Sequence, residues 1–139
     1  MKNMFLILSI FIFITGCSEG ETKQQENSIY GTWKLIEIYQ GDGGNNPQWT
    51  TVDSGYTYTF NNDRIFSSTR FTDCISGTYE VSGNSITLDY SCNGFNTGIE
   101  TPPGTFVESY IFENANLILT PSYLNCFEGC DYKFEKIEN

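Results

Sequence analysis

The residues of this chain best suited to chemistry are its five cysteines. A thiol can form a disulfide, bind a metal ion as a thiolate, or carry a lipid. Cys17 stands alone near the amino terminus, and the others are Cys74, Cys92, Cys126 and Cys130. An even number of cysteines in an exported domain favours disulfides. A zinc site is the weaker alternative, because these four lack the paired Cys-x-x-Cys spacing of zinc knuckles.

The chain contains no histidine. This removes the usual general base, the common catalytic triads and the commonest metal ligand. Asp42, Asp53 and Asp73 fall between the predicted strands and Asp131 at the end of a predicted loop, where solvated loop charge explains them. Residues 41–46 offer oxygen ligands but not the spaced carboxylates of a calcium loop. The sequence therefore predicts a protein that is not an enzyme and holds no metal ion or cofactor.

The first residues have the pattern of an export signal. Lys2 precedes an apolar run over residues 4–14, which is much shorter than the roughly 20 residues of a membrane-spanning helix. The run ends in Ile14-Thr15-Gly16-Cys17, which resembles the lipobox of bacterial lipoproteins. The resemblance implies that residues 1–16 are a signal peptide and that lipid, palmitate included, is attached to Cys17. Such lipid would anchor the protein to a membrane without spanning it.

Residues 17–28 are almost entirely polar and cannot bury enough surface to order themselves. We expect a flexible tether there, followed by one domain over residues 29–139. Glu19 and Glu21 resemble the surface-export signal of lipoproteins from the Bacteroidota, which implies the cell envelope, at the periplasmic or outer face of the outer membrane. A merely soluble linker is the alternative.

The charge of the chain excludes one class of partner. The formal net charge is −10, and it becomes more negative once Lys2 is removed. A nucleic-acid-binding protein needs a basic face, so we expect no nucleic-acid partner. Acidic charge favours solubility, and we expect a monomer.

The remaining sequence has the pattern of β-structure. Aromatic residues make up 16% of the chain, and apolar residues alternate with a period of two. Residues 56–60 place three aromatic side chains on one face and two threonines on the other. The first strand breaks this alternation at Leu35-Ile36, which indicates a bulge. The predicted strands, uncertain by about two to four residues at each end, are 31–40, 55–60, 64–70, 77–82, 85–91, 105–112, 117–121 and 131–137.

The connections between these strands alternate in length. The tight ones are 61–63, 83–84 and 113–116, and the long ones are 41–54, 71–76, 92–104 and 122–130. Alternate loops of an antiparallel meander lie at the same end of the sheet. We therefore expect a closed end that carries the tight turns and a mouth that carries the long loops.

Gly31-Thr32-Trp33 opens the first predicted strand. This tripeptide and the loop pattern resemble the lipocalin family, and the chain looks closer to the short bacterial lipocalin-like lipoproteins than to typical secreted lipocalins. The resemblance covers residues 31–137 and implies an all-β, eight-stranded antiparallel up-and-down barrel, anchored at its closed end by Gly31 and Trp33. Family members usually hold an arginine of the last strand against this tryptophan. Here that strand carries Lys133 and Lys136, either of which could make a weaker cation–π contact.

The strand map also bears on the cysteines, all four of which it places at the mouth. The 83–84 hairpin brings Cys74 and Cys92 nearly opposite each other. Gly129 gives the short Cys126–Cys130 loop a residue that tolerates a positive φ. We therefore favour Cys74–Cys92 and Cys126–Cys130 among three connectivities, and other pairings or free thiols are the alternatives.

A barrel of eight strands is either filled by its own side chains or holds one small ligand. The tyrosine hydroxyls among the predicted inward residues would supply the few polar groups that ligand sites use. We expect a small apolar ligand. The alternative is a surface interaction or inhibitor module with a filled core, acting through its long loops. The candidate lining residues are Tyr56, Tyr58, Phe60, Tyr79, Val81, Ile86, Leu88 and Tyr90, with Trp49, Tyr123 and Phe127 as a lid.

Overall fold

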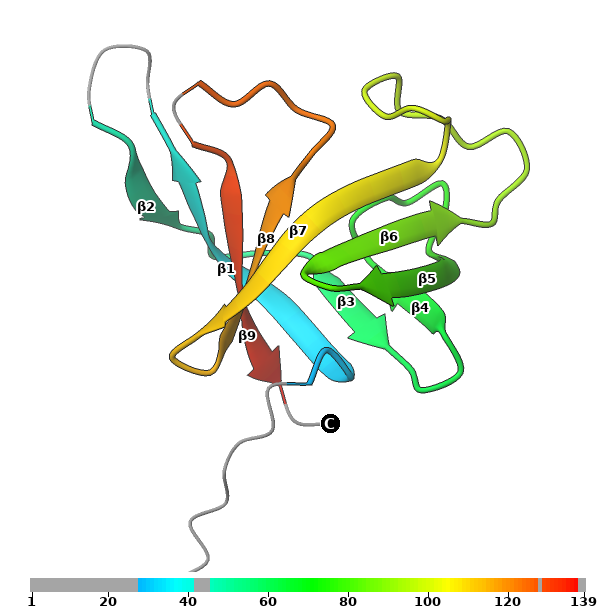
Figure 1. Cartoon of the computed structure of the whole chain (residues 1–139), viewed down its shortest axis with the longest axis horizontal. Coiled ribbons are helices and arrows are strands. Elements are labelled where there is room, and N and C mark those ends of the chain that lie inside the picture. Colours follow the sequence, from blue (N-terminus) through cyan, green and yellow to red (C-terminus); the bar gives the residue numbers. More distant parts are fainter. Residues whose placement is uncertain (1–27, 42–45, 128, 138–139) are drawn as a thin grey trace, which may run out of the picture.

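The computed structural model describes residues 28–41, 46–127 and 129–137. The predicted signal peptide, the lipobox and nearly all of the tether lie outside the described residues. Figure 1 labels the strands of the described part. They are β1 (Gly31–Gln40), β2 (Gln48–Thr51), β3 (Thr57–Phe60), β4 (Ile65–Ser68), β5 (Ser76–Ser82), β6 (Ser85–Tyr90), β7 (Thr105–Glu113), β8 (Asn116–Pro121) and β9 (Asp131–Ile137).

The strands form a closed antiparallel barrel. Each strand from β3 to β8 pairs with the next one along the chain, and β1 closes the circle by pairing with β3 on one side and β9 on the other. The eight-stranded lipocalin-like barrel is therefore confirmed. The predicted bulge is confirmed too, because the β1–β9 register shifts between Leu35 and Glu37.

The main correction concerns residues 41–54, which were predicted to be one long loop. They contain β2, which pairs with the second half of β1 while β3 pairs with the first half. The two strands together flank β1 as one strand interrupted by a bend, which the Val52 amide and the Tyr56 carbonyl tie to β1. Gly55 allows this close approach, since a Cβ atom there would lie 1.9 Å from the Leu35 carbonyl oxygen.

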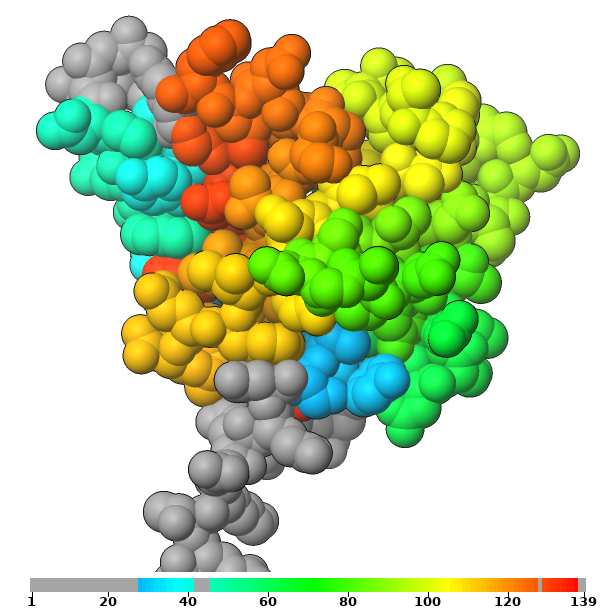
Figure 2. Space-filling model, in the orientation of Figure 1, coloured from blue at the N-terminus to red at the C-terminus, as the bar shows by residue number. Residues whose placement is uncertain are grey.

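The two ends of the barrel differ as predicted. Figure 1 shows the connections that follow β6 and β8 at one end, which we call the mouth, and the turns after β3 and β7 at the other, which we call the closed end. The turn after β7 is tight because Asn114 and Ala115 both adopt a positive φ. The space-filling view shows the β6–β7 and β8–β9 loops as separate projections with a notch between them (Figure 2).

Aromatic rings fill much of the barrel interior. Tyr58, Phe66, Phe106 and Phe134 have no exposed surface. The ring centre of Tyr58 lies within about 6 Å of the centres of several other rings, among them that of Phe134 at 5.8 Å. The core of the domain thus contains a connected set of rings, packed together with buried aliphatic side chains such as Leu117 and Leu119.

One residue that was predicted to be buried inside the barrel is partly exposed. Val81 is 40% exposed, although its partner across the hairpin, Ile86, is fully buried. The strand pairing gives the reason. β4 pairs with β5 only as far as Thr78, so no neighbouring strand flanks Val81 on that side.

Candidate functional site

The closed end is built around Trp33. Its side chain is 2% exposed, and its indole N–H donates a hydrogen bond of 2.7 Å to the Ile29 carbonyl oxygen. The Nζ atom of Lys136 lies 5.3 Å from the centre of the indole, so a lysine contact replaces the arginine usual in lipocalins. Gly31 leaves room for that lysine, because a Cβ atom at this position would lie 2.7 Å from the Lys136 Cε atom.

Both favoured disulfides are formed. Cys74 pairs with Cys92 and Cys126 with Cys130, so the alternative pairings and a four-thiolate zinc site are not realised. The two bridges differ in burial. Cys74 is 1% exposed and belongs to the hydrophobic core, whereas Cys126 is exposed. The first bridge therefore joins the mouth to the core, and the second clamps the tip of a loop.

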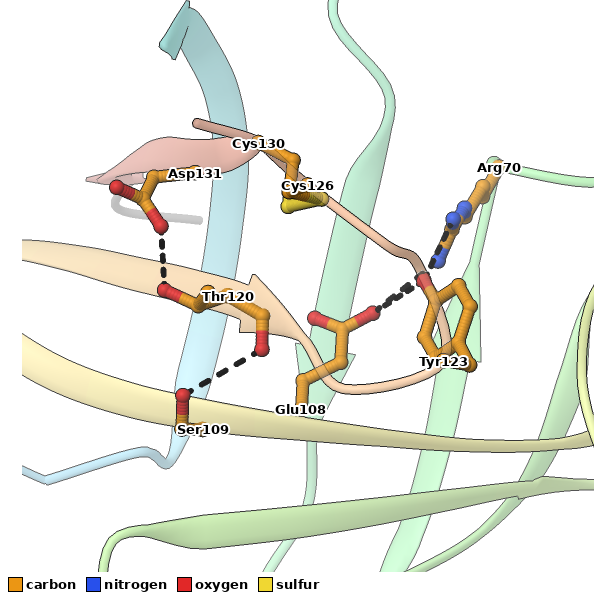
Figure 3. Close-up of a disulfide and its surroundings, with 8 residues drawn as sticks. All are labelled: Arg70, Glu108, Ser109, Thr120, Tyr123, Cys126, Cys130 and Asp131. Carbon is orange, nitrogen blue, oxygen red and sulfur yellow. Dashed lines mark hydrogen bonds and ion pairs between the residues drawn. A yellow bond between two sulfur atoms is a disulfide. The ribbon is translucent and has the colours of Figure 1, made fainter. Parts of the chain in front are cut away.

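Polar side chains from four elements meet inside the mouth. Arg70 follows β4, Tyr58 lies in β3, Glu108 in β7, and Tyr123 in the loop after β8. We call these four residues the mouth cluster. Figure 3 shows the Tyr123 hydroxyl between the Arg70 guanidinium and the Glu108 carboxylate.

The hydrogen bonds of the mouth cluster converge on the carboxylate and the guanidinium. Arg70 donates through Nη1 to the Tyr58 hydroxyl at 3.1 Å and to Glu108 Oε1 at 3.3 Å. It donates through Nη2 to the Tyr123 hydroxyl at 3.0 Å, and this hydroxyl donates to Glu108 Oε1 at 3.0 Å. Each charge thus has both an ionic and a phenolic partner.

The surroundings of this ion pair are dry and aromatic. The side chains of Glu108 and Arg70 are 2% and 12% exposed. The guanidinium carbon lies 5.0 Å from the ring centre of Phe71 and 5.2 Å from that of Phe106. Burial raises the pKa of Glu108 above its ordinary value, although Arg70 and the Tyr123 hydroxyl oppose this rise. A carboxylate in such a place responds strongly to what lies beside it.

The structure brings four of the candidate tyrosines together around this arginine. Tyr58 and Tyr123 are hydrogen-bonded to Arg70, and the ring centre of Tyr56 lies 5.6 Å from its guanidinium carbon. Tyr90 belongs to the adjoining aromatic group, 5.5 Å from Phe106. These tyrosines remain candidates for contact with a ligand.

The other inward candidates lie outside the mouth cluster. Phe60 and Leu88 are buried core residues. Tyr79 is buried and its hydroxyl donates to the Asn61 carbonyl oxygen at 2.6 Å, beside the β3–β4 turn. Burial raises the pKa of Tyr79 to about 12. This residue therefore belongs to the closed end.

Trp49 does not cover the mouth. It lies opposite Tyr39 in the β1–β2 pair, with ring centres 5.2 Å apart, and residues directly opposite in a sheet share a face. The Nζ atom of Lys133 lies 3.9 Å from its ring centre. The neighbours of Lys133 in β9, Tyr132 and Phe134, pack against the core, so this cluster lies on the outer face. Phe127, also predicted as a lid, is 97% exposed.

The predicted site residues did not include Arg70 or Glu108, although the sequence carries a signal for both. The inward face of the strand at 64–70 runs Phe66, Ser68, Arg70, and that of β7 runs Phe106, Glu108. Opposite charges on the apolar faces of two predicted strands indicate a buried ion pair.

Glu100 organises the long loop between β6 and β7. Its carboxylate is 4% exposed and accepts hydrogen bonds of 2.9 Å from the backbone N–H groups of Thr97 and Gly104. Burial opposes its ionisation, but these bonds and the one from the Thr97 hydroxyl prevail and lower its pKa to about 2. This loop is thus held in place from within.

The predicted loop aspartates remain apart from the mouth cluster. Asp42 lies outside the described residues, Asp53 and Asp73 are exposed, and Asp131 accepts a hydrogen bond from the Thr120 hydroxyl. In the described ranges, no group of three or more acidic, cysteine or histidine side chains could hold a metal ion. Nor does that part of the chain contain a helix with the length and apolar character to cross a membrane.

Comparison with known proteins gives one match. The family model described as "Lipocalin-like domain" matches residues 29–125, which include β1 to β8 and all four members of the mouth cluster. Comparisons with curated proteins and with solved structures gave no match.

Proposed function

The chain belongs to the lipocalin-like domain family, and we propose that it is a lipid-anchored, non-enzymatic envelope protein that binds a small, mainly apolar ligand at the mouth of its barrel. The observation that carries this proposal is the mouth cluster. Ligand sites combine apolar walls with a few convergent polar groups, and here the aromatic rings supply the walls while Arg70 and Glu108 supply the polar groups.

The position of Tyr123 supports binding at the mouth rather than deep in the barrel. The rings below the mouth cluster are fully buried and belong to strands. Tyr123 instead belongs to the loop after β8, and a loop side chain can leave its place without breaking strand pairing. The site would therefore open at the mouth while the barrel stays closed.

A second candidate function has its own observation. Phe127 is 97% exposed beside the Cys126–Cys130 bridge, which restrains the loop that carries it. An exposed aromatic side chain on a restrained loop is a suitable anchor for a protein partner. An interaction module of this kind would need no ligand and would keep its interior filled.

The proposed lipid anchor would join the domain at its closed end. Figure 1 shows the start of the described chain at the closed end. Lipid on Cys17 would attach the domain to the membrane from the side of its closed end, through the tether, and would leave the mouth free. We expect Cys17→Ala to move the protein to the soluble fraction, with Cys126→Ala as the control that retains the lipid site. Membrane fractions that still hold the Cys17→Ala protein after a salt wash would contradict the proposed anchor.

Native mass spectrometry of the full chain tests the binding function. We expect a co-purified compound, seen as extra mass that disappears on denaturation. Phe127→Ser should keep this extra mass, because Phe127 lies outside the proposed site. Absence of any bound compound, together with loss of a protein partner on Phe127→Ser, would favour the interaction module instead.

A further inference from the structure

Tyr123 occupies the mouth in a way that no other tyrosine there does. Its ring meets that of Phe106 edge to face, with centres 5.1 Å apart, and its hydroxyl lies 3.0 Å from both Arg70 Nη2 and Glu108 Oε1. Tyr56 and Tyr58 belong to β3 or the segment just before it, whereas Tyr123 belongs to a loop. A loop side chain thus fills an otherwise strand-built site.

The groups that Tyr123 contacts define the chemistry of this place. A group there must accept a hydrogen bond from a guanidinium and donate one to a carboxylate. A hydroxyl does both. A second carboxylate could only accept and would lie beside Glu108, and an ammonium could only donate and would lie beside Arg70. A hydrocarbon would leave the ion pair in place but would remove one hydrogen bond from each of its two charges.

A further polar atom faces the same aromatic group. The Tyr90 hydroxyl is the one buried side-chain oxygen or nitrogen without a hydrogen-bond partner among the residues the structure describes. Tyr90 is 5% exposed, and its ring lies 5.3 Å from Phe71 and 5.5 Å from Phe106. Burial raises the pKa of Tyr90, and the nearby Ser68 and Tyr58 side chains oppose this rise, so a bound molecule would share this hydroxyl with those two neighbours.

Space next to Tyr123 allows it to leave. A surface cavity of about 190 Å³ lies between the β6–β7 and β8–β9 loops, and Tyr123 is part of its wall. Ile99, Val107 and Ser122 line it as well. The side chain therefore borders both the interior of the mouth and an open cavity outside it.

We propose that the mouth binds a phenol, a molecule with an aromatic ring and a hydroxyl group on it, by exchange with Tyr123. The ligand ring packs on Phe106 and its hydroxyl takes the place of the tyrosine hydroxyl between Arg70 and Glu108. When no ligand is bound, the side chain of Tyr123 fills the site. This inference rests on the proposed function and names the ligand class for the same site.

Calorimetric titration of the full chain with three matched probes tests the exchange. The probes are 4-ethylphenol, ethylbenzene and 4-ethylbenzoate, which differ only in the group directed at the ion pair. We expect 4-ethylphenol to bind at least about tenfold more tightly than either of the others. Ethylbenzene makes no hydrogen bond to the ion pair, and 4-ethylbenzoate places a second carboxylate beside Glu108.

Variants of Tyr123 test its part as the occupant. Tyr123→Ala removes the competitor, and we expect 4-ethylphenol to bind it about tenfold more tightly than the wild type. Tyr123→Phe keeps the ring but loses the hydroxyl, and it should change affinity in the same direction even if the alanine variant fails to fold. Phe127→Ala, a nearby change on the same loop, should leave affinity unchanged.

Three results would overturn the phenol inference. One is equal binding of ethylbenzene and 4-ethylphenol to Tyr123→Ala, and another is tighter binding of 4-ethylbenzoate. The third is no binding of 4-ethylphenol to any variant. If a compound nevertheless co-purifies with the chain, only the phenol inference fails. If no compound co-purifies and no probe binds, the proposed function fails with it.

Discussion

The closed end and the mouth of this barrel differ in whether their charged side chains are buried. At the closed end, Lys136 is exposed and extends over the buried indole of Trp33, so its charge stays in water. At the mouth, Arg70 and Glu108 are both buried. Burying an ion pair costs desolvation energy that a well-packed apolar pair would avoid. The closed end is thus arranged for stability. At the mouth, a role in ligand binding explains the buried Arg70 and Glu108 better than a role in stability does.

The two ends also differ in what holds them together. Trp33 is held by packing and by one hydrogen bond to Ile29. The mouth is held by two disulfides and by carboxylates such as Glu100 that bond to loop backbone. Loops without strand pairing need such restraints, and they are also the parts that open locally at the smallest free-energy cost.

The largest effect should come from the closed end. Trp33→Ala should lower the free energy of unfolding by about 3–5 kcal/mol, because it removes a fully buried aromatic side chain. Urea denaturation of the full chain measures this loss. Trp49→Ala is the matched control on the outer face and should cost less than about 1 kcal/mol. Equal losses for the two tryptophans would contradict the claim that the closed end is the main source of stability.

The ion pair at the mouth should behave differently, because its loss can be compensated. Arg70→Met leaves the Glu108 carboxyl buried without its cation and should cost about 3 kcal/mol. Adding Glu108→Leu should restore most of this loss in the same urea titration, since an apolar pair needs no desolvation. A double variant as unstable as the sum of the single ones would show that the ion pair itself stabilises the barrel.

The two disulfides should contribute unequally to the stability of the barrel, because they differ in burial and in the length of the loop that they close. Replacing Cys74 and Cys92 by alanine should cost about 2–3 kcal/mol, because the bridge spans 18 residues and Cys74 packs in the core. Replacing Cys126 and Cys130, which are 4 residues apart, should cost about 1–2 kcal/mol. Thermal unfolding of both variants checks the order. A larger loss for the second pair would mean that the clamped loop supports the barrel.

The smallest expected effect is at Glu100, and it depends on pH. Folding lowers the pKa of Glu100 to about 2, so the folded state favours the ionised form. Its stabilisation is therefore complete above the ordinary carboxyl pKa of about 4.5 and disappears as the pH falls through about 2. Glu100→Gln should cost about 1–2 kcal/mol at pH 6 and much less at pH 2.5, as measured by urea denaturation. A loss independent of pH would exclude the charge as its cause.

The sequence predicted the barrel well because its signals are local. Period-two alternation located the strands, and the alternating loop lengths located the two ends. The 83–84 hairpin also predicted that Cys74 and Cys92 would meet, since the observed β5–β6 register continues toward both cysteines. The strand that was missed, β2, has only 4 residues and is extended by its pairing with β1 rather than by its own pattern.

The candidate site was less predictable because it depends on contacts between distant segments. The alternation placed the tyrosines inside the barrel, but it could not show that Arg70 reaches Glu108, 38 residues away, or that Tyr123 folds inward. Trp49 and Phe127 were assigned to the mouth because they lie in or near long loops. Position in a loop does not determine which way a side chain points, and both point away from the interior.

Amide hydrogen exchange of the full chain tests the central claim most directly, namely that the mouth opens while the closed end stays shut. Residues 69–75, 91–104 and 122–127 should exchange through local openings, at least about tenfold faster than the amides of β1 and β9 around Trp33. Adding urea below the unfolding midpoint should accelerate the strands and change the mouth little. Equal exchange at the two ends, with the same dependence on urea, would contradict a mouth that opens on its own.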